Sequence, residues 1–170
     1  MVKMSEMSDK DFEARKPYFG VGVHEVILTG ATTGEATTGS KFIEFELLGE
    51  NDEEGSVRLY LTEKTVERTR SILATIAVHN KDGEVEKQKV RDGFKKITDS
   101  DEMLTEKFLA KFKDMQAWIL TEEDKSAPKP NGGFYLRSNL YSYEPKPRAT
   151  TIQQDIEGGK PVDLSEIPFN

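Results

Sequence analysis

The chain has 170 residues, no cysteine and a formal net charge of −7. The missing cysteines exclude disulfides, thiolate metal sites and cysteine nucleophiles. No apolar run approaches the roughly 18 residues that span a bilayer, and the N-terminal stretch lacks the apolar core of a signal peptide, so we expect a cytoplasmic protein with no membrane contact.

Residues 1–17 are polar with scattered methionines, and we expect them to form a flexible arm. The following segments are rich in β-branched and aromatic residues or alternate in polarity, which predicts strands at 18–30, 41–49 and 56–61. The apolar spacing changes phase between Val23 and Val26, where a β-bulge would restore the alternation. The intervening ATTGEATTGS predicts a flexible turn, so the three strands form an antiparallel meander.

After the third strand the pattern takes the period of a helix. Residues 62–80 place apolar side chains at helical spacing, and Thr62 can serve as the N-cap. The helical signal is weaker over 81–97, whereas the segment 101–115 has one apolar stripe, formed by Leu104, Phe108, Phe112 and Met115. Two further strands are predicted at 114–120 and 134–143, on either side of a polar loop.

Three strands, a helix and two more strands is the order of the OB-fold, a five-stranded Greek-key barrel that binds oligonucleotides and oligosaccharides. We therefore predict a mainly β (α+β) fold, with an OB-fold domain at 18–145 and a helical insertion between strands three and four. The arm at 1–17 precedes it, and an acidic tail at 146–170, expected to be disordered, follows. The part of the insertion at 81–113 exceeds what a minimal OB-fold requires.

Aromatic and cationic residues alternate on the predicted outward faces. In the last strand Phe134, Leu136 and Leu140 are predicted to face inward, which directs the tyrosines and Arg137 outward. Bases of single-stranded nucleic acid stack on aromatic rings while arginine and lysine follow the phosphates. The candidate nucleic-acid-binding residues are Phe42, Arg58, Tyr60, Lys125, Lys129, Tyr135, Arg137, Tyr141 and Tyr143. The alternative that these aromatics are ordinary strand surface stays open.

The charge is distributed unevenly near the C-terminus. From Lys125 to Arg148 there are five cations and one carboxylate, a net +4, whereas Thr151–Asn170 has four carboxylates and one lysine, a net −3. A basic segment is therefore followed directly by an acidic tail, and local charge decides what a groove attracts.

Nothing in the pattern indicates catalysis. His24 and His79 are the only histidines, lie far apart in the sequence and have no carboxylate cluster at metal-ligand spacing around them. No serine lies in a nucleophile-elbow context. We expect no enzymatic activity, no cofactor and no bound metal.

The chain ends in DLSEIPFN, with acidic residues before an apolar tip. This ending resembles the C-terminal tip of bacterial and phage single-stranded DNA-binding proteins, in which acidic residues precede Ile-Pro-Phe after a linker. It departs from that pattern because Asn170 follows the phenylalanine and the acids are sparser. The resemblance implies a partner-binding tip made of Asp163, Glu166, Ile167, Pro168 and Phe169.

The resemblance and the predicted barrel imply a sequence-nonspecific single-stranded DNA-binding protein, acting in the host cytoplasm if a phage encodes it. It would protect the strand and recruit replication, recombination or repair proteins through its tip. The alternative is a phage structural or assembly β-barrel that binds another protein and not DNA. A homodimer is compatible with either reading.

Overall fold

The computed structural model describes residues 2–7 and 17–146. The regular elements, in chain order, are β1 (Gly22–Glu35), β2 (Lys41–Gly49), β3 (Glu54–Tyr60), α1 (Val66–His79), α2 (Glu84–Lys95), the 3₁₀ helix η2 (Ser100–Leu104), α3 (Glu106–Ala110), β4 (Gln116–Pro128) and β5 (Phe134–Tyr141). The fold is mainly β, and the predicted order of three strands, helical segment and two strands is confirmed.

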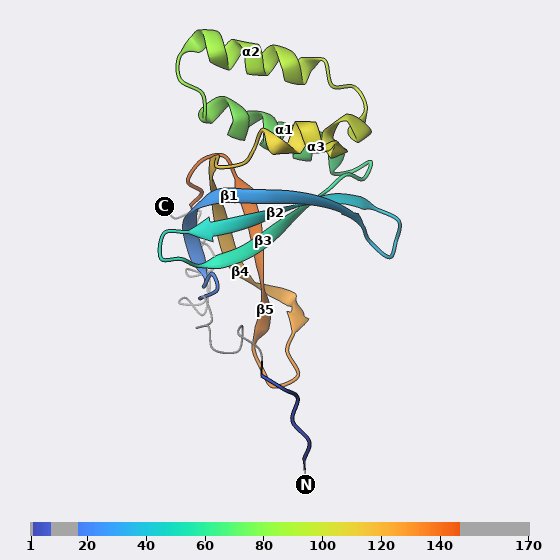
Figure 1. Cartoon of the computed structure of the whole chain (residues 1–170), viewed down its shortest axis with the longest axis vertical. Coiled ribbons are helices and arrows are strands. Elements are labelled where there is room, and N and C mark those ends of the chain that lie inside the picture. The colour runs from blue at the N-terminus through green and yellow to red at the C-terminus, as the bar shows by residue number, and fades with distance from the viewer. Residues whose placement is uncertain (1, 8–16, 147–170) are drawn as a thin grey trace, which may run out of the picture.

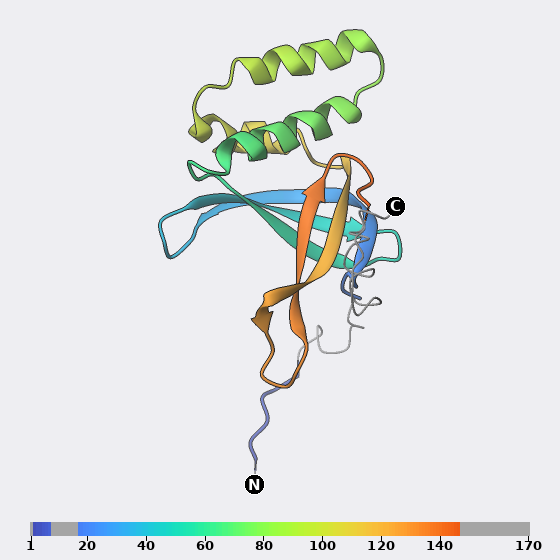
Figure 2. The ribbon, with the colours of Figure 1, turned by 180° about the vertical axis from the view of Figure 1, so that it is seen from behind.

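The five strands form one antiparallel sheet in the order β3-β2-β1-β4-β5. The central strand β1 pairs with β4 over Gly22–Ile27 and with β2 over Val26–Glu35. A register shift between Leu28 and Gly30 lies just after the point where β1 leaves β4, and such a bulge bends the strand. The β4–β5 hairpin therefore crosses the other three strands steeply (Figures 1 and 2).

The core lies between the concave face of the sheet and the helices, which stand together on one side of it (Figure 1). Phe112 connects the two layers, because its ring centroid is 5.8 Å from that of Phe45 in β2 and 5.5 Å from that of Phe108 in α3. α2 differs from the other helices in that it has no buried residue. The sheet and α1 thus supply most of the fully buried side chains.

The predicted closed barrel is not seen in the described residues, because the hydrogen-bonded sheet stays open with β3 and β5 as its edges. The two edge strands nevertheless line one groove.

Phe19, only 2% exposed, packs against Gly49 and Gly55 near the β2–β3 turn. The folded part therefore begins close to the predicted boundary at residue 18.

Two hairpins are longer than predicted. β1 continues through Ala31–Glu35, which the sequence assigned to a flexible turn, because this stretch pairs in register with β2 up to Glu35 opposite Lys41. The bulge lies at Leu28–Gly30 and not between Val23 and Val26, since regular pairing with β4 holds over those valines. β4 likewise continues to Pro128, into the predicted loop. Both hairpins extend past the core, which explains why Leu136 is 40% exposed and not inward as predicted.

The helical segment also differs in detail from the expectation. The N-cap position of α1 is Thr65 and not Thr62, although the Thr62 hydroxyl still accepts a hydrogen bond from the Thr65 amide at 3.2 Å. The predicted helix over 101–115 is broken into η2 and α3, because Asp99 and Thr105 each cap a new helix with a side-chain oxygen. The predicted apolar stripe survives the break, since all four of its members pack on the core.

Residues 1, 8–16 and 147–170 lie outside the description. The predicted tip, Asp163 to Phe169, falls entirely in the last of these ranges, as does nearly all of the predicted tail. Among the helices that the structure describes, none combines the length and apolar character needed to cross a bilayer.

Candidate nucleic-acid interface

The convex face of β2 and β3 carries a compact cluster around Phe42. Phe42 lies opposite Tyr60, and Glu44 lies opposite Arg58. The Arg58 guanidinium carbon is 4.2 Å from the centroid of the Phe42 ring, Tyr60 meets that ring edge-on at 5.6 Å, and Arg58 Nε donates to Glu44 Oε1 at 2.6 Å. The cluster thus holds the guanidinium by a stacked ring and a carboxylate together.

This packing corrects one predicted site residue. Phe42 was expected to offer its ring to a base, but only 8% of it is exposed, because Arg58 and Tyr60 cover it. Gly34, opposite Phe42 on β1, completes the enclosure: a Cβ at Gly34 would lie 2.5 Å from Phe42 Cζ. Phe42 therefore acts as a support for Arg58 and Tyr60.

The connection from β3 to α1 places a further arginine beside this cluster. The backbone carbonyl of Tyr60 accepts hydrogen bonds from the hydroxyls of Thr65 at 2.7 Å and Thr69 at 2.8 Å. These bonds anchor the first turn of α1 at the end of β3. Arg68, which precedes the buried Thr69, is consequently held exposed at the same place.

A groove of about 320 Å³ separates the two edge strands and is closed at one end by α1. It is lined by Val57, Arg58, Leu59, Tyr60, Thr65, Arg68, Thr69, Ile72, Arg137, Ser138, Asn139 and Leu140. We call it the three-arginine groove, after Arg58, Arg68 and Arg137. None of these lining residues is acidic, so the part of the chain that the structure describes contributes cations, hydroxyls, an amide, one phenol ring and four aliphatic side chains to the groove.

The three guanidinium groups differ in how they are held. Glu44 binds Arg58 and raises the pKa of its guanidinium, with a smaller contribution from the Tyr60 hydroxyl. Arg137 lies 4.0 Å from Asp124, a carboxylate whose pKa is lowered first by hydrogen bonds from Ser126 and then by the charge of Arg137. Arg68 has no ion-pair partner within residues 2–7 and 17–146. It is therefore the guanidinium most available to an incoming anion.

The remaining predicted residues lie along β5 and its hairpin with β4. Near the turn of the β4–β5 hairpin, Lys129 Nζ is 5.6 Å from the ring centroid of Tyr135, which is 54% exposed. Lys125 Nζ is 4.6 Å from the Phe134 ring and 3.0 Å from Glu123 Oε1. The turn region of this hairpin thus combines exposed cations with an exposed ring.

At the opposite end of β5, Tyr141 pairs across the strands with Trp118, and its ring lies 5.7 Å from that of Tyr143. Trp118 itself is half-buried. Tyr135, Arg137, Asn139 and Tyr141 alternate along β5, a span of about 20 Å at the usual rise of a strand. The structure therefore brings Arg58, Tyr60 and Arg137 together, with Tyr135 and Tyr141 at either end of the same strand.

The histidines occupy structural positions. The imidazole of His24 donates from Nε2 to the Gly20 carbonyl at 2.7 Å, and that of His79 donates from Nδ1 to the Ser142 carbonyl at 2.8 Å. Within the described ranges no group of three or more His, Cys, Asp or Glu side chains could hold a metal ion.

A glycine pair tests the Phe42 cluster. We expect Gly34→Ala to destabilise the fold by about 1–3 kcal/mol, because the new Cβ must displace the Phe42 ring and with it Arg58. Gly93→Ala is the matched control: it lies in α2 with nothing within 4 Å of a built Cβ, so it should stabilise by up to about 1 kcal/mol. Urea unfolding of both variants provides the comparison, and equal effects would contradict the packing.

No protein-family model matches this sequence, and no curated protein matches it either. A function must therefore be argued from the residues of the groove and from the sequence of the tail.

Proposed function

We propose that the chain is an OB-fold protein that binds single-stranded DNA without strong sequence preference. The sheet order β3-β2-β1-β4-β5, with the helices between the third and fourth strands, is compatible with an OB-fold whose β3 and β5 edges lie near each other and do not pair. The three-arginine groove runs along this seam. Its position between strands and its lack of acidic lining residues favour a flexible polyanion as the ligand.

The observation that carries the proposal is the approach of Arg58, Arg68 and Arg137 beside Tyr60 in one groove. Guanidinium groups bind phosphate oxygens in a bidentate manner, and exposed tyrosine rings at Tyr60 and Tyr135 offer stacking surfaces to bases. A single strand can present phosphates to the groove and turn its bases toward the rings. Bases in a duplex are already stacked and gain nothing from these rings.

The tail completes the proposal. The acidic and apolar tip, Asp163 to Phe169, would bind replication, recombination or repair proteins, as its resemblance to the tips of bacterial and phage single-stranded DNA-binding proteins suggests. A short peptide of this kind binds weakly, and several copies gathered on one DNA strand would compensate by effective concentration.

A second candidate is favoured by one observation, the open edges of the sheet. The backbone groups of β3 and β5 that are not paired in the sheet could accept a strand from another protein, as in an assembly protein that does not bind DNA.

Titration with a dT oligonucleotide and a duplex of equal length at two salt concentrations separates the candidates. Salt-dependent binding of the single strand supports the first, and no binding at low salt supports the second.

Arg68 provides a matched test of the groove. We expect Arg68→Ala to weaken binding of a dT oligonucleotide and to reduce the slope of log K against log salt by about 0.7, the value for one phosphate contact on a single strand. Arg91→Ala removes the same charge from α2, where Arg91 binds Glu84 and Gln88, and should leave the slope unchanged. Equal slopes for both variants would mean that Arg68 meets no phosphate.

The stacking surfaces are tested separately. We expect Tyr60→Ala and Tyr135→Ala each to weaken dT binding by about 1–3 kcal/mol with the salt slope retained, because a ring is lost and no charge is removed. Tyr18→Ala removes a tyrosine that is more exposed than either and lies outside the groove and hairpin, so it should have no effect. Fluorescence anisotropy with a labelled oligonucleotide measures all three. Unchanged affinity in both site variants would eliminate the stacking role.

A further inference from the structure

A second groove, of about 510 Å³, opens within the helical segment and shares no lining residue with the three-arginine groove. Its apolar lining comes from α1, α2, α3 and the segments beside them: Ala77, Val90, Phe94, Ile97, Phe108, Phe112 and Met115. Most of these side chains are only partly buried, although they pack on the core. The groove therefore presents apolar surface that the described residues leave uncovered.

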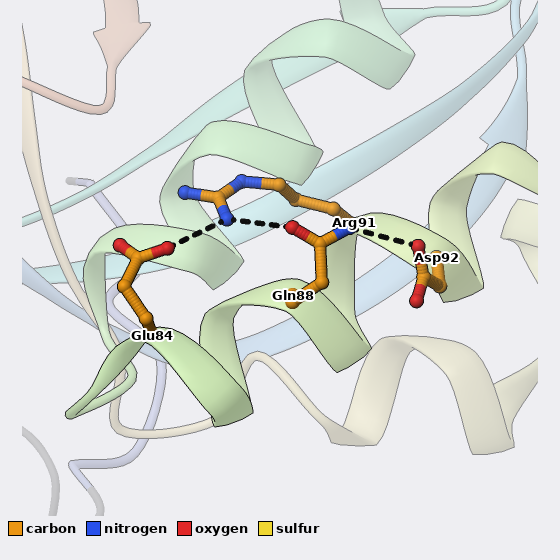
Figure 3. Close-up of polar contacts among 4 residues, drawn as sticks. All are labelled: Glu84, Gln88, Arg91 and Asp92. Carbon is orange, nitrogen blue, oxygen red and sulfur yellow. Dashed lines mark hydrogen bonds and ion pairs between the residues drawn. The ribbon is translucent and has the colours of Figure 1, made fainter.

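The two faces of α2 show why this groove stays open. One face carries a continuous polar chain in which Arg91 donates to Glu84 at 3.2 Å and to Gln88 at 3.1 Å, while Gln88 donates to Asp92 at 2.9 Å (Figure 3). The other face turns Val90, Gly93 and Phe94 toward the groove. Because α2 has no buried residue, this apolar face has no complete partner among the described residues.

Lysines dominate the rim of the groove. Lys81, Lys89, Lys107 and Lys111 line it together with Glu86 and Glu102, which leaves a net charge of +2. Both carboxylates are already engaged: Glu86 binds Lys89 at 3.2 Å, and Glu102 accepts from the Thr98 and Asp99 amides. Lys81, Lys107 and Lys111 have no ion pair within the described ranges. An apolar peptide with carboxylates fits this combination.

The chain itself supplies such a peptide, and the residues just after β5 contact the end of α1, a helix that contributes to the groove. Residues 163–169 combine two carboxylates with Leu164, Ile167, Pro168 and Phe169. After β5, the carbonyl of Ser142 accepts a hydrogen bond from His79 at the end of α1, close in sequence to Ala77 and Lys81 of the groove lining. The 16 residues at 147–162 can span about 50 Å when extended, which is ample for the tip to return.

We propose that residues 163–169 dock in this helical groove of their own chain, with Ile167 and Phe169 on its apolar floor and Asp163 and Glu166 at the lysine rim. A docked tip is withheld from other proteins, and a partner must compete with the groove to bind it. This assigns a role to the helical segment at 81–113. The docking requires no DNA, so its test and the test of DNA binding are independent.

Methionine methyl resonances report on the groove directly. Met115 lines it, whereas the buried Met103 lies outside its lining and serves as an internal reference. In the full chain labelled with ¹³C at the methionine methyl groups, we expect Phe169→Ala to shift the Met115 resonance, because the ring current of Phe169 is lost, while Met103 stays in place. Ile152→Ala removes an apolar side chain from the tail outside the tip and should shift neither resonance.

Charge reversal tests the rim. In the Lys107→Glu, Lys111→Glu background we expect Phe169→Ala to have no further effect on Met115, since the tip is no longer held. Adding Asp163→Lys and Glu166→Lys to that background should restore the effect of Phe169→Ala. A Met115 resonance that is identical with and without Phe169 overturns the proposal. A shift that disappears on tenfold dilution also overturns it, because the tip would then come from a second copy.

Discussion

The three-arginine groove depends on how the backbone passes from the end of β3 into α1. The Tyr60 carbonyl lies at a sheet edge and receives two threonine hydroxyls, from Thr65 and Thr69, at 2.7 and 2.8 Å. A buried or half-buried carbonyl without partners would cost free energy, so these bonds satisfy the edge and orient the helix at once. Arg68 follows from that orientation, since it precedes the buried Thr69 and stands exposed over the groove.

The three arginines of the groove are held to different degrees by their neighbours, and a carboxylate does not neutralise the charge of each one. Arg58 is held between the Phe42 ring and Glu44, which positions its guanidinium and leaves it half-exposed. Arg137 has a looser partner in Asp124, and an exposed pair at 4.0 Å contributes little, so a phosphate can displace it. The groove thus pairs one rigid cation with two that can respond to a ligand. The helical groove also has free cations, since three of its four lysines have no ion pair within the described ranges and lie beside an apolar floor.

Alternation of polarity was sufficient to predict the bounds of β2, because inward side chains such as Ile43, Phe45 and Leu47 repeat with period two. The local sequence pattern also predicted the order of strands and helices along the chain. Contacts between strands distant in sequence were not accessible in this way. The burial of Phe42 depends on Gly34 in another strand, and the approach of Arg68 to Arg137 depends on β3 and β5 lining the same groove. The ends of β1 and β4 were missed for a related reason: pairing extends them through residues whose own composition favours turns.

Mapping bound single-stranded DNA onto the full chain tests most directly whether the three-arginine groove is the binding site. Backbone amide resonances would be followed by NMR while a dT oligonucleotide is added at low salt. We expect the largest shifts on β3, the first turn of α1 and β5, the elements that line the three-arginine groove. Shifts confined to other elements, or none at all, would contradict binding in this groove.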